Sequence, residues 1–225
     1  MVREKFLSIK KRIEIYRKPK IFGIGLNKTG TTSLKTAMKE LGFSVGYQPR
    51  GEGLIIDWKN RNFNNLISYC YTAQFFQDVP FSLPFTYVIL DHAFPKSKFI
   101  LTVRDNSDQW YRSITKFHSK LWGKDNQTPN KEQLRNAEYL TKGWPWEFNR
   151  ANFNTPINDL YNREQLINYY DNHYINVMEY FRHKQDNLLV LNVAEPDSYT
   201  SLCNFLGVKG KRNDFPWKNK TIKNN

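Results

Sequence analysis

The sequence predicts an α/β fold in which helices flank a small parallel sheet of four or five strands. Three short apolar runs, 21–24, 99–103 and 188–193, alternate along the chain with segments of helical periodicity. This alternation is typical of parallel strands joined by right-handed crossover helices. The 225 residues are 40% hydrophobic, which is enough to bury one sizeable core.

Each apolar run is short enough to be a buried strand, and the segments between the runs predict the helices. The helix after the first run covers 31–41, and Gly42 can end it. An extended piece at 43–46 is the candidate for a further strand. Further helices are predicted over 62–77, 84–94, 106–121, 131–142, 163–184 and 197–206. The region 118–165 fits no strand.

Asparagine residues provide start signals for three of these helices. Asn130 with Gln133, and Asn162 with Gln165, resemble capping boxes in which Asn replaces Ser or Thr. Asn106 or Ser107 can cap the helix that begins near 106.

The net charge of +13 is concentrated at the two ends. Residues 1–20 carry +6 and residues 209–225 carry +5, so the rest of the chain carries only +2. We expect one domain over 1–225 whose basic ends, about 1–19 and 211–225, are solvated and flexible. Such ends can steer an anionic ligand or contact RNA.

The sequence gives no sign of a membrane span, a secretory signal, a disulfide framework or a zinc site. The chain has no run of 18 apolar residues and no apolar stretch of a secretory signal at its start, which predicts a cytoplasmic protein without a transmembrane segment. Cys70 and Cys203 are too few and too far apart for a disulfide framework or a zinc site. We expect Cys203 to lie in the core.

The segment Ile21 to Leu34, IFGIGLNKTGTTSL, predicts a phosphate-binding loop between a strand and a helix. Gly25 and Gly30 allow a tight path, partly with positive φ, that turns successive N–H groups towards one point. The following helix adds the positive end of its dipole. Lys28 supplies a full charge, and the threonines supply hydroxyl groups.

A second polar group follows the strand at 99–103. Arg104 stands at the carboxyl end of that strand, where open α/β sheets bind ligands. Ser113 lies about two turns into the next helix, whose apolar positions recur with helical spacing. The two polar segments therefore meet at one edge of the predicted sheet.

Both segments resemble those of the sulfotransferase family, and the sequence looks most like its bacterial-type branch. Lys-Thr-Gly-Thr-Thr after a strand resembles the 5′-phosphosulfate loop of that family, whose donor is 3′-phosphoadenylyl sulfate. The resemblance covers most of 20–220. Weaker pieces that support it are 76–81, Phe94-Pro95, 187–193, 202–207 and Phe215-Pro216-Trp217 with Asn219.

The resemblance implies a three-layer, P-loop-like fold and a set of donor-binding residues. The loop contributes Lys28, Thr29, Gly30, Thr31, Thr32 and Ser33, while Arg104 and Ser113 hold the 3′-phosphate. In the family the serine more often follows the arginine by eight residues; here it follows by nine. Lys209, Lys211 and Arg212 lie where the family has a basic loop, but the pattern does not match well enough to name contacts. No metal is required.

The resemblance also implies two catalytic roles, an ammonium for the leaving phosphate and a base for the acceptor. Lys28 fits the first role. Asp78 is the leading candidate for the base, since it is predicted to end an aromatic helix, 71–77, near the ligand edge of the sheet. Glu52, in the loop 50–53, is the second candidate.

The histidines are weaker candidates for the base. His92 is expected at the surface and His173 in the core, while His118 and His183 stand beside lysines and are expected to be solvated. The acceptor stays open among small molecules, glycans and lipids with a hydroxyl or amine. Region 118–165, rich in tryptophan, is expected to form a cap over its pocket, with the tryptophans packing in the core.

Two other functions are weighed against sulfuryl transfer. A P-loop kinase is disfavoured because the lysine precedes the second glycine of the loop and no predicted strand ends in an aspartate for Mg²⁺. A basic nucleotide- or RNA-binding module without catalysis is the third hypothesis. Nucleic acid is not the expected partner, because the charge sits at the ends of the chain. The oligomeric state is not predicted.

Overall fold

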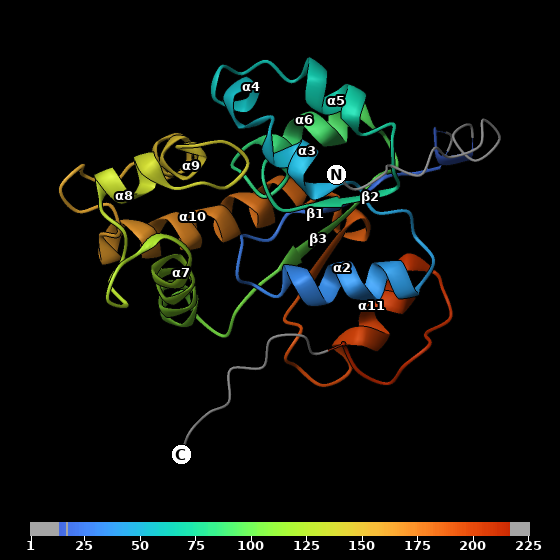
Figure 1. Ribbon diagram of the computed structural model, residues 1–225. Helices are drawn as coiled ribbons and strands as arrows, with labels where there is room; N and C mark the ends of the chain where they lie inside the picture. Colours follow the sequence, from blue (N-terminus) through green and yellow to red (C-terminus); the bar gives the residue numbers. More distant parts are fainter. Residues whose placement is uncertain (1–13, 17, 217–225) are drawn as a thin grey trace.

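A parallel sheet lies between layers of helices in the computed structural model, which describes residues 14–16 and 18–216 (Figure 1). Its strands within these residues are β1 (Ile21–Gly23), β2 (Phe75–Gln77), β3 (Lys98–Thr102) and β4 (Leu188–Leu191). The spatial order is β2-β1-β3-β4, and all neighbours are parallel. The predicted fold class is therefore confirmed.

The helices occupy the positions between the strands, as the alternating pattern predicted. Those of the described chain are α2 (Thr31–Glu40), α3 (Gln48–Glu52), α4 (Ile55–Lys59), α5 (Asn64–Tyr69), α6 (Thr86–Ala93), α7 (Ser107–Trp122), α8 (Lys131–Asn136), α9 (Trp144–Asn152), α10 (Arg163–Phe181), the 3₁₀ turn η1 (Gln185–Asn187) and α11 (Ser198–Leu206).

Strands β1, β2 and β3 are buried on both faces, which produces the three layers, while the edge strand β4 is buried only at Leu191. Phe22 and Phe99 pack into one cluster with α5, α6 and α10. Ile21 and Ile100 point the other way and pack against α2 and α11. Successive residues of a strand face opposite sides, so continuous apolar runs fit a sheet that is covered twice.

The segment 62–77 differs from the prediction of one long helix. Helix α5 ends at Tyr69, and residues 75–77 form β2, which pairs with β1 through Ile21–Phe75 and Gly23–Gln77. Pairing buries the rings of Phe75 and Phe76 in opposite clusters. The aromatic run supports either structure locally, and only the neighbouring strand decides. The predicted strand near Phe43 is reduced to one bridge, between Val45 and Phe75.

The region 118–165, which we call the cap, contains no strand, as predicted. Helix α8 ends at Asn136, earlier than predicted, and α9 was not predicted. Trp144 and Phe148 of α9 join a third buried cluster with α4, α7 and α10. The prediction that the cap aromatics pack in the core is confirmed for these two rings, which are 8% and 5% exposed.

Both cysteines and one lysine of the basic first end are buried. Cys70 and Cys203 are buried free thiols. Lys20, counted among the basic residues of the first end, is buried, and its Nζ donates to the carbonyls of Ile15 and Ala73.

Residues 1–13, 17 and 217–225, with Trp217 and Asn219, lie outside the described chain. A single domain with flexible ends stays a prediction. None of the described helices is long and apolar enough to cross a membrane.

The close approach of β1 and β3 leaves no room for a side chain at Gly25. A Cβ there would lie 2.0 Å from Oγ1 of Thr102 and 2.6 Å from its backbone nitrogen. Gly25 is therefore required for contact between strands, whereas Gly30 adopts the positive φ that the loop needs, 105°.

We expect Gly25→Ala to lower the free energy of unfolding by about 1–3 kcal/mol, because β3 must move to admit the methyl group. Urea unfolding would measure the change. Gly53→Ala is the matched control, since its nearest atoms are 3.5 Å away. Equal stability of the two variants would contradict the close-contact argument.

Candidate active site

The loop between β1 and α2 presents unused backbone donors at the start of a helix. Lys28 has φ 73° and Gly30 has φ 105°, so the chain turns sharply before α2 begins at Thr31. Within the described chain, the N–H groups of residues 30–33 have no hydrogen-bond acceptor, and α2 has no side-chain cap. Four free donors at the positive end of a helix dipole are the arrangement with which helix N-termini bind anions.

Neighbouring elements hold this loop in place. The Thr29 hydroxyl donates to the Leu26 carbonyl at 2.6 Å and lies 2.6 Å from the Thr102 hydroxyl of β3. The Trp110 indole of α7 donates to the Asn27 carbonyl at 2.9 Å. The loop is therefore held in its shape by hydrogen bonds to β3 and α7.

A contact between Thr29 and the sulfuryl donor stays a prediction, and the structure places the Thr29 hydroxyl inside the protein. The side chain is completely buried and its hydroxyl is engaged inside the protein. Thr31 is also buried, and it lies beside the Asp78 carboxyl. Thr32 is exposed and Ser33 is half-buried, so these two side chains stay accessible at the helix start.

Arg104 lies next to Lys28, as expected for groups at the ends of neighbouring strands. Its Nε donates to the Lys28 carbonyl at 2.6 Å, and its backbone N–H donates to the Tyr170 hydroxyl at 2.9 Å. Ser113 is half-buried, two turns into α7, and no described residue forms a hydrogen bond with its side chain. A role of Ser113 in binding stays a prediction.

The Lys28 ammonium lies 4.0 Å from the centre of the Phe117 ring of α7. Burial is the main cause that lowers its pKa, and the nearby Arg104 charge lowers the pKa further, while Asp78 raises it. Lys28 is thus a partly desolvated cation beside a carboxylate, which strengthens its attraction for an anion.

Asp78 lies at the carboxyl end of β2, not at the end of a helix as predicted. It is 5% exposed, and Gln77 Nε2 donates to its Oδ2 at 2.9 Å. Its Oδ1 is buried without a hydrogen-bond partner among the described residues. Burial raises the pKa of Asp78, and the Thr31 hydroxyl, Gln77 and the charges of Lys35 and Lys28 oppose that rise.

Glu52 also differs from its prediction, because it ends helix α3 and is only 3% exposed. Gln48 donates to its Oε1 at 2.7 Å, and the Tyr139 hydroxyl lies 3.4 Å from the same oxygen. Burial raises the pKa of Glu52, and the Asp78 charge adds to the rise. The two carboxylates therefore lie close enough to interact.

One histidine was misjudged. His118 is buried, and its Nδ1 lies 3.0 Å from the Tyr161 hydroxyl, so it is not solvated. Burial, with a contribution from the Lys28 charge, lowers its pKa to about 3. His173 is packed as predicted, against the Ile24 carbonyl at 2.8 Å, while His92 and His183 are exposed.

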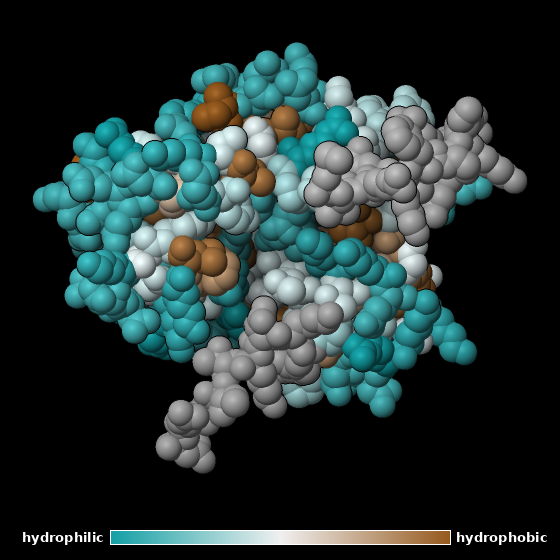
Figure 2. Space-filling view, viewed as in Figure 1, coloured by the Kyte–Doolittle hydropathy of each residue, from teal (hydrophilic) through white to brown (hydrophobic). Residues whose placement is uncertain are grey.

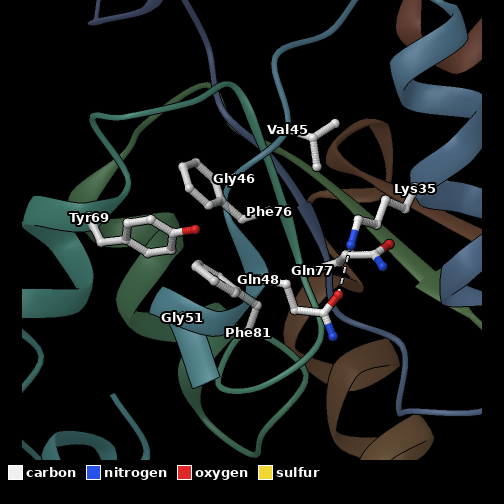
Figure 3. A pocket seen from close by; sticks show the side chains of 9 residues that line it. All are labelled: Lys35, Val45, Gly46, Gln48, Gly51, Tyr69, Phe76, Gln77 and Phe81. Atoms are coloured by element: carbon white, nitrogen blue, oxygen red, sulfur yellow. Dashed lines mark hydrogen bonds between the residues drawn. The ribbon is translucent and has the colours of Figure 1, made fainter. Parts of the chain in front are cut away.

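The surface is hollowed between the cap side and α2, and a hydrophobic patch lies over α7 beside the hollow (Figure 2). Helix α7 exposes Phe117 and Leu121. Beyond β2, a small pocket has the aromatic rings of Tyr69, Phe76 and Phe81 along one wall, and Lys35, Gln48 and Gln77 along the other (Figure 3). The Lys35 ammonium donates to Gln48 Oε1 at 2.9 Å.

The basic segment after α11 contacts the opposite end of α2. Lys211 Nζ donates to the Glu40 carbonyl at 2.5 Å, and Arg212 pairs with the Glu40 carboxylate at 3.4 Å. Ten residues of helix, about 15 Å, separate these contacts from the loop. Both side chains stabilise the negative end of α2.

The chain matches the family model described as "Sulfotransferase domain" over residues 20–223. The chain belongs to the sulfotransferase family. No curated protein matches it. The sulfotransferase domain makes the protein a transferase of sulfuryl groups, and the predicted family is confirmed. Its place in the bacterial-type branch stays a prediction.

Sequence reasoning missed the residues that position the loop and the carboxylates of this sulfotransferase domain. Lys35 could have been found, because it follows Thr31 by one helical turn and shares its face of α2. Tyr139 and Phe117 carry no local signal. Among the described residues, no group of three or more His, Cys, Asp or Glu side chains is arranged to hold a metal.

We expect Asp78→Asn to raise the melting temperature by a few degrees near pH 7.5. Burial makes the pKa of Asp78 higher in the folded state than in the unfolded state, so ionisation disfavours folding above the unfolded pKa of about 4. The gain should shrink as the pH falls and vanish when both states are protonated. Thermal unfolding between pH 4 and 8 would measure it.

The control for this series is Asp186→Asn, at an exposed site in η1. It should give the same small change at every pH. A loss of stability in Asp78→Asn that does not depend on pH would contradict the buried-charge argument.

Proposed function

We propose that the protein transfers a sulfuryl group from 3′-phosphoadenylyl sulfate to an acceptor hydroxyl, with Asp78 as the base. One observation carries the proposal: Lys28 and a buried aspartate with a free oxygen lie together beside the open N–H groups of α2. A cation, a set of anion-binding donors and a proton acceptor are what transfer between two oxygens requires.

The loop supplies the groups that would hold the 5′-phosphosulfate. These are the free N–H groups of 30–33 and the accessible side chains of Thr32 and Ser33 at the helix start. Arg104 donates from Nε to the loop, and its terminal nitrogens have no hydrogen-bond partner among the described residues, which fits a contact with the 3′-phosphate. Ser113 remains the proposed second contact to that phosphate.

During transfer, the charge that develops on the leaving phosphate oxygen must be neutralised, and the acceptor oxygen must lose its proton. The acceptor oxygen forms a bond to sulfur while the bond from sulfur to the phosphate oxygen breaks. Lys28 stabilises the charge that develops on the leaving phosphate, and Asp78 Oδ1 takes the acceptor proton. The raised pKa of Asp78 makes it a stronger base than an exposed aspartate. Glu52 is the alternative base.

The structure corrects one argument against a kinase. Strand β2 leads directly into Asp78, so a strand does end beside an aspartate. The lysine position in the loop still differs from that of nucleotide triphosphatases, and the family match favours sulfuryl transfer. Mg²⁺-ATP therefore belongs in the test as a competing ligand. A cytoplasmic location stays a prediction.

We expect adenosine 3′,5′-bisphosphate to stabilise the protein without Mg²⁺. At 100 times its Kd a ligand adds about 2.7 kcal/mol, or roughly 5–10 °C in Tm for a chain of this size. Lys28→Ala should lose most of this shift, while Lys39→Ala, at an exposed site in the last turn of α2, should keep it. Differential scanning fluorimetry measures both.

Other outcomes of the same experiment would replace the proposal. Stabilisation by Mg²⁺-ATP alone would indicate a kinase. Steeply salt-dependent RNA binding without either shift would indicate a nucleic-acid-binding module. Sulfuryl transfer that survives Lys28→Ala would remove the role of this lysine.

Arg104→Ala should weaken adenosine 3′,5′-bisphosphate roughly 10- to 100-fold more than adenosine 5′-phosphate, the effect of losing charge-assisted hydrogen bonds to one phosphate. Calorimetric titration of both ligands gives the ratio. Arg112→Ala, which removes an exposed partner of Asp108, is the control. Equal weakening of both ligands would show that Arg104 acts only by holding the Lys28 carbonyl.

A further inference from the structure

Helix α7 exposes apolar side chains that its packing in the core does not use. Trp110 and Ile114 are buried, each 1% exposed, and they hold the helix against the cluster that it forms with α4, α9 and α10. Phe117 and Leu121 continue the same helical spacing but are 36% and 46% exposed. Figure 2 shows a hydrophobic patch over α7 with hydrophilic residues around it.

Exposed cations form a row on the solvent side of the same helix. Arg112, Lys116 and Lys120 are exposed and follow one another at intervals of four residues, which places them on one face. Arg112 pairs with Asp108, the only acidic residue of α7. Lys116 and Lys120 form no ion pair with any described residue. Helix α7 therefore presents two uncompensated lysines next to two exposed apolar side chains.

The combination of cations and apolar side chains decides which partner fits. Lysines attract any anionic surface, so their charge alone does not distinguish a membrane from RNA. RNA, however, has no apolar layer into which an exposed leucine can be transferred from water. A bilayer that contains anionic lipids has a negative surface with an apolar layer beneath it, and basic amphipathic helices bind such surfaces.

The exposed apolar side chains of α10 provide a contrast within the same molecule. Three of them lie close together near the end of that helix, 40%, 57% and 39% exposed: Tyr174, Ile175 and Met178. The adjacent charges are those of Glu179 and Arg182, which pair with each other. This second patch therefore has no excess of positive charge to attract an anionic surface.

We propose that α7 is a docking surface for anionic bilayers. Lys116 and Lys120 contact lipid phosphates, while Phe117 and Leu121 enter the boundary between headgroups and acyl chains. The Lys28 ammonium lies 4.0 Å from the centre of the Phe117 ring, so docking brings the β1–α2 loop to the bilayer. The inference uses the exposure and charge of α7 and does not depend on the proposed transfer reaction.

Flotation of the full chain with vesicles tests the proposal. Vesicles of equimolar phosphatidylcholine and phosphatidylglycerol should bind the protein, and vesicles of phosphatidylcholine alone should bind it weakly. Leu121→Glu should weaken binding roughly 10-fold or more, because one apolar side chain no longer leaves water and a negative charge is added. Ile175→Glu makes the same exchange on α10 and should bind as the unchanged chain does. Lys116→Gln should weaken binding roughly 5-fold.

An attached fluorophore reports insertion separately from attraction by charge. Cys70 and Cys203 are buried, so a thiol-reactive nitrobenzoxadiazole label should react with a cysteine introduced at an exposed position. The label on Leu121→Cys should shift its emission to shorter wavelength when anionic vesicles are added. The label on Ile175→Cys should not shift. Part of the binding should survive high salt, because salt screens charges but does not weaken apolar insertion.

Several outcomes would overturn the proposal. Equal binding of Leu121→Glu and the unchanged chain, with no shift of the label at position 121, would assign binding to the basic ends. No binding to anionic vesicles would also overturn it. Salt-sensitive binding of RNA that Leu121→Glu leaves unchanged, without vesicle binding, would indicate a polyanion as the partner instead. Neither transfer nor adenosine 3′,5′-bisphosphate enters these measurements, so such a failure leaves the proposed function standing.

Discussion

The contact between the β1 loop and β3 at Thr102 is the constraint on which the site depends. Thr102 lies against Gly25, where no side chain fits, and its hydroxyl meets that of Thr29. These contacts fix where the loop leaves the sheet, and therefore where the N–H groups of α2 point. Arg104, two residues beyond Thr102, then reaches the Lys28 carbonyl.

The site combines charges that the fold brings in from separate layers. Lys28 comes from the loop, Asp78 from the end of β2 and Glu52 from α3, and burial shifts the pKa of each away from its ordinary value. Neutralisation by Lys35 and Lys28 makes a buried pair of carboxylates tolerable. Buried acceptors without hydrogen-bond partners and carboxylates with raised pKa values are typical of functional sites.

The cap contributes aromatic side chains to the site, whereas the charged groups Lys28, Asp78 and Glu52 come from other elements. Its aromatic residues form a cluster with α4, α7 and α10, so the side chains at its edge are held in place. Tyr139 of the cap contacts Glu52, and Phe117 of α7 lies against the Lys28 ammonium. The acceptor preference is therefore expected to follow from the cap and α3, while the loop and Arg104 serve the donor.

Local patterns in the sequence determined the α/β class, the phosphate loop with Lys28, the position of Arg104 and most helices, because strand length, helical periodicity and glycine spacing are encoded within a few residues. They could not identify β2, since 75–77 becomes a strand only through pairing with β1. The environment of Asp78, the burial of Glu52 and His118 and the internal role of Thr29 were likewise decided by tertiary structure. Burial and partners are set by segments far apart in the chain, and no local spacing records which of them will meet.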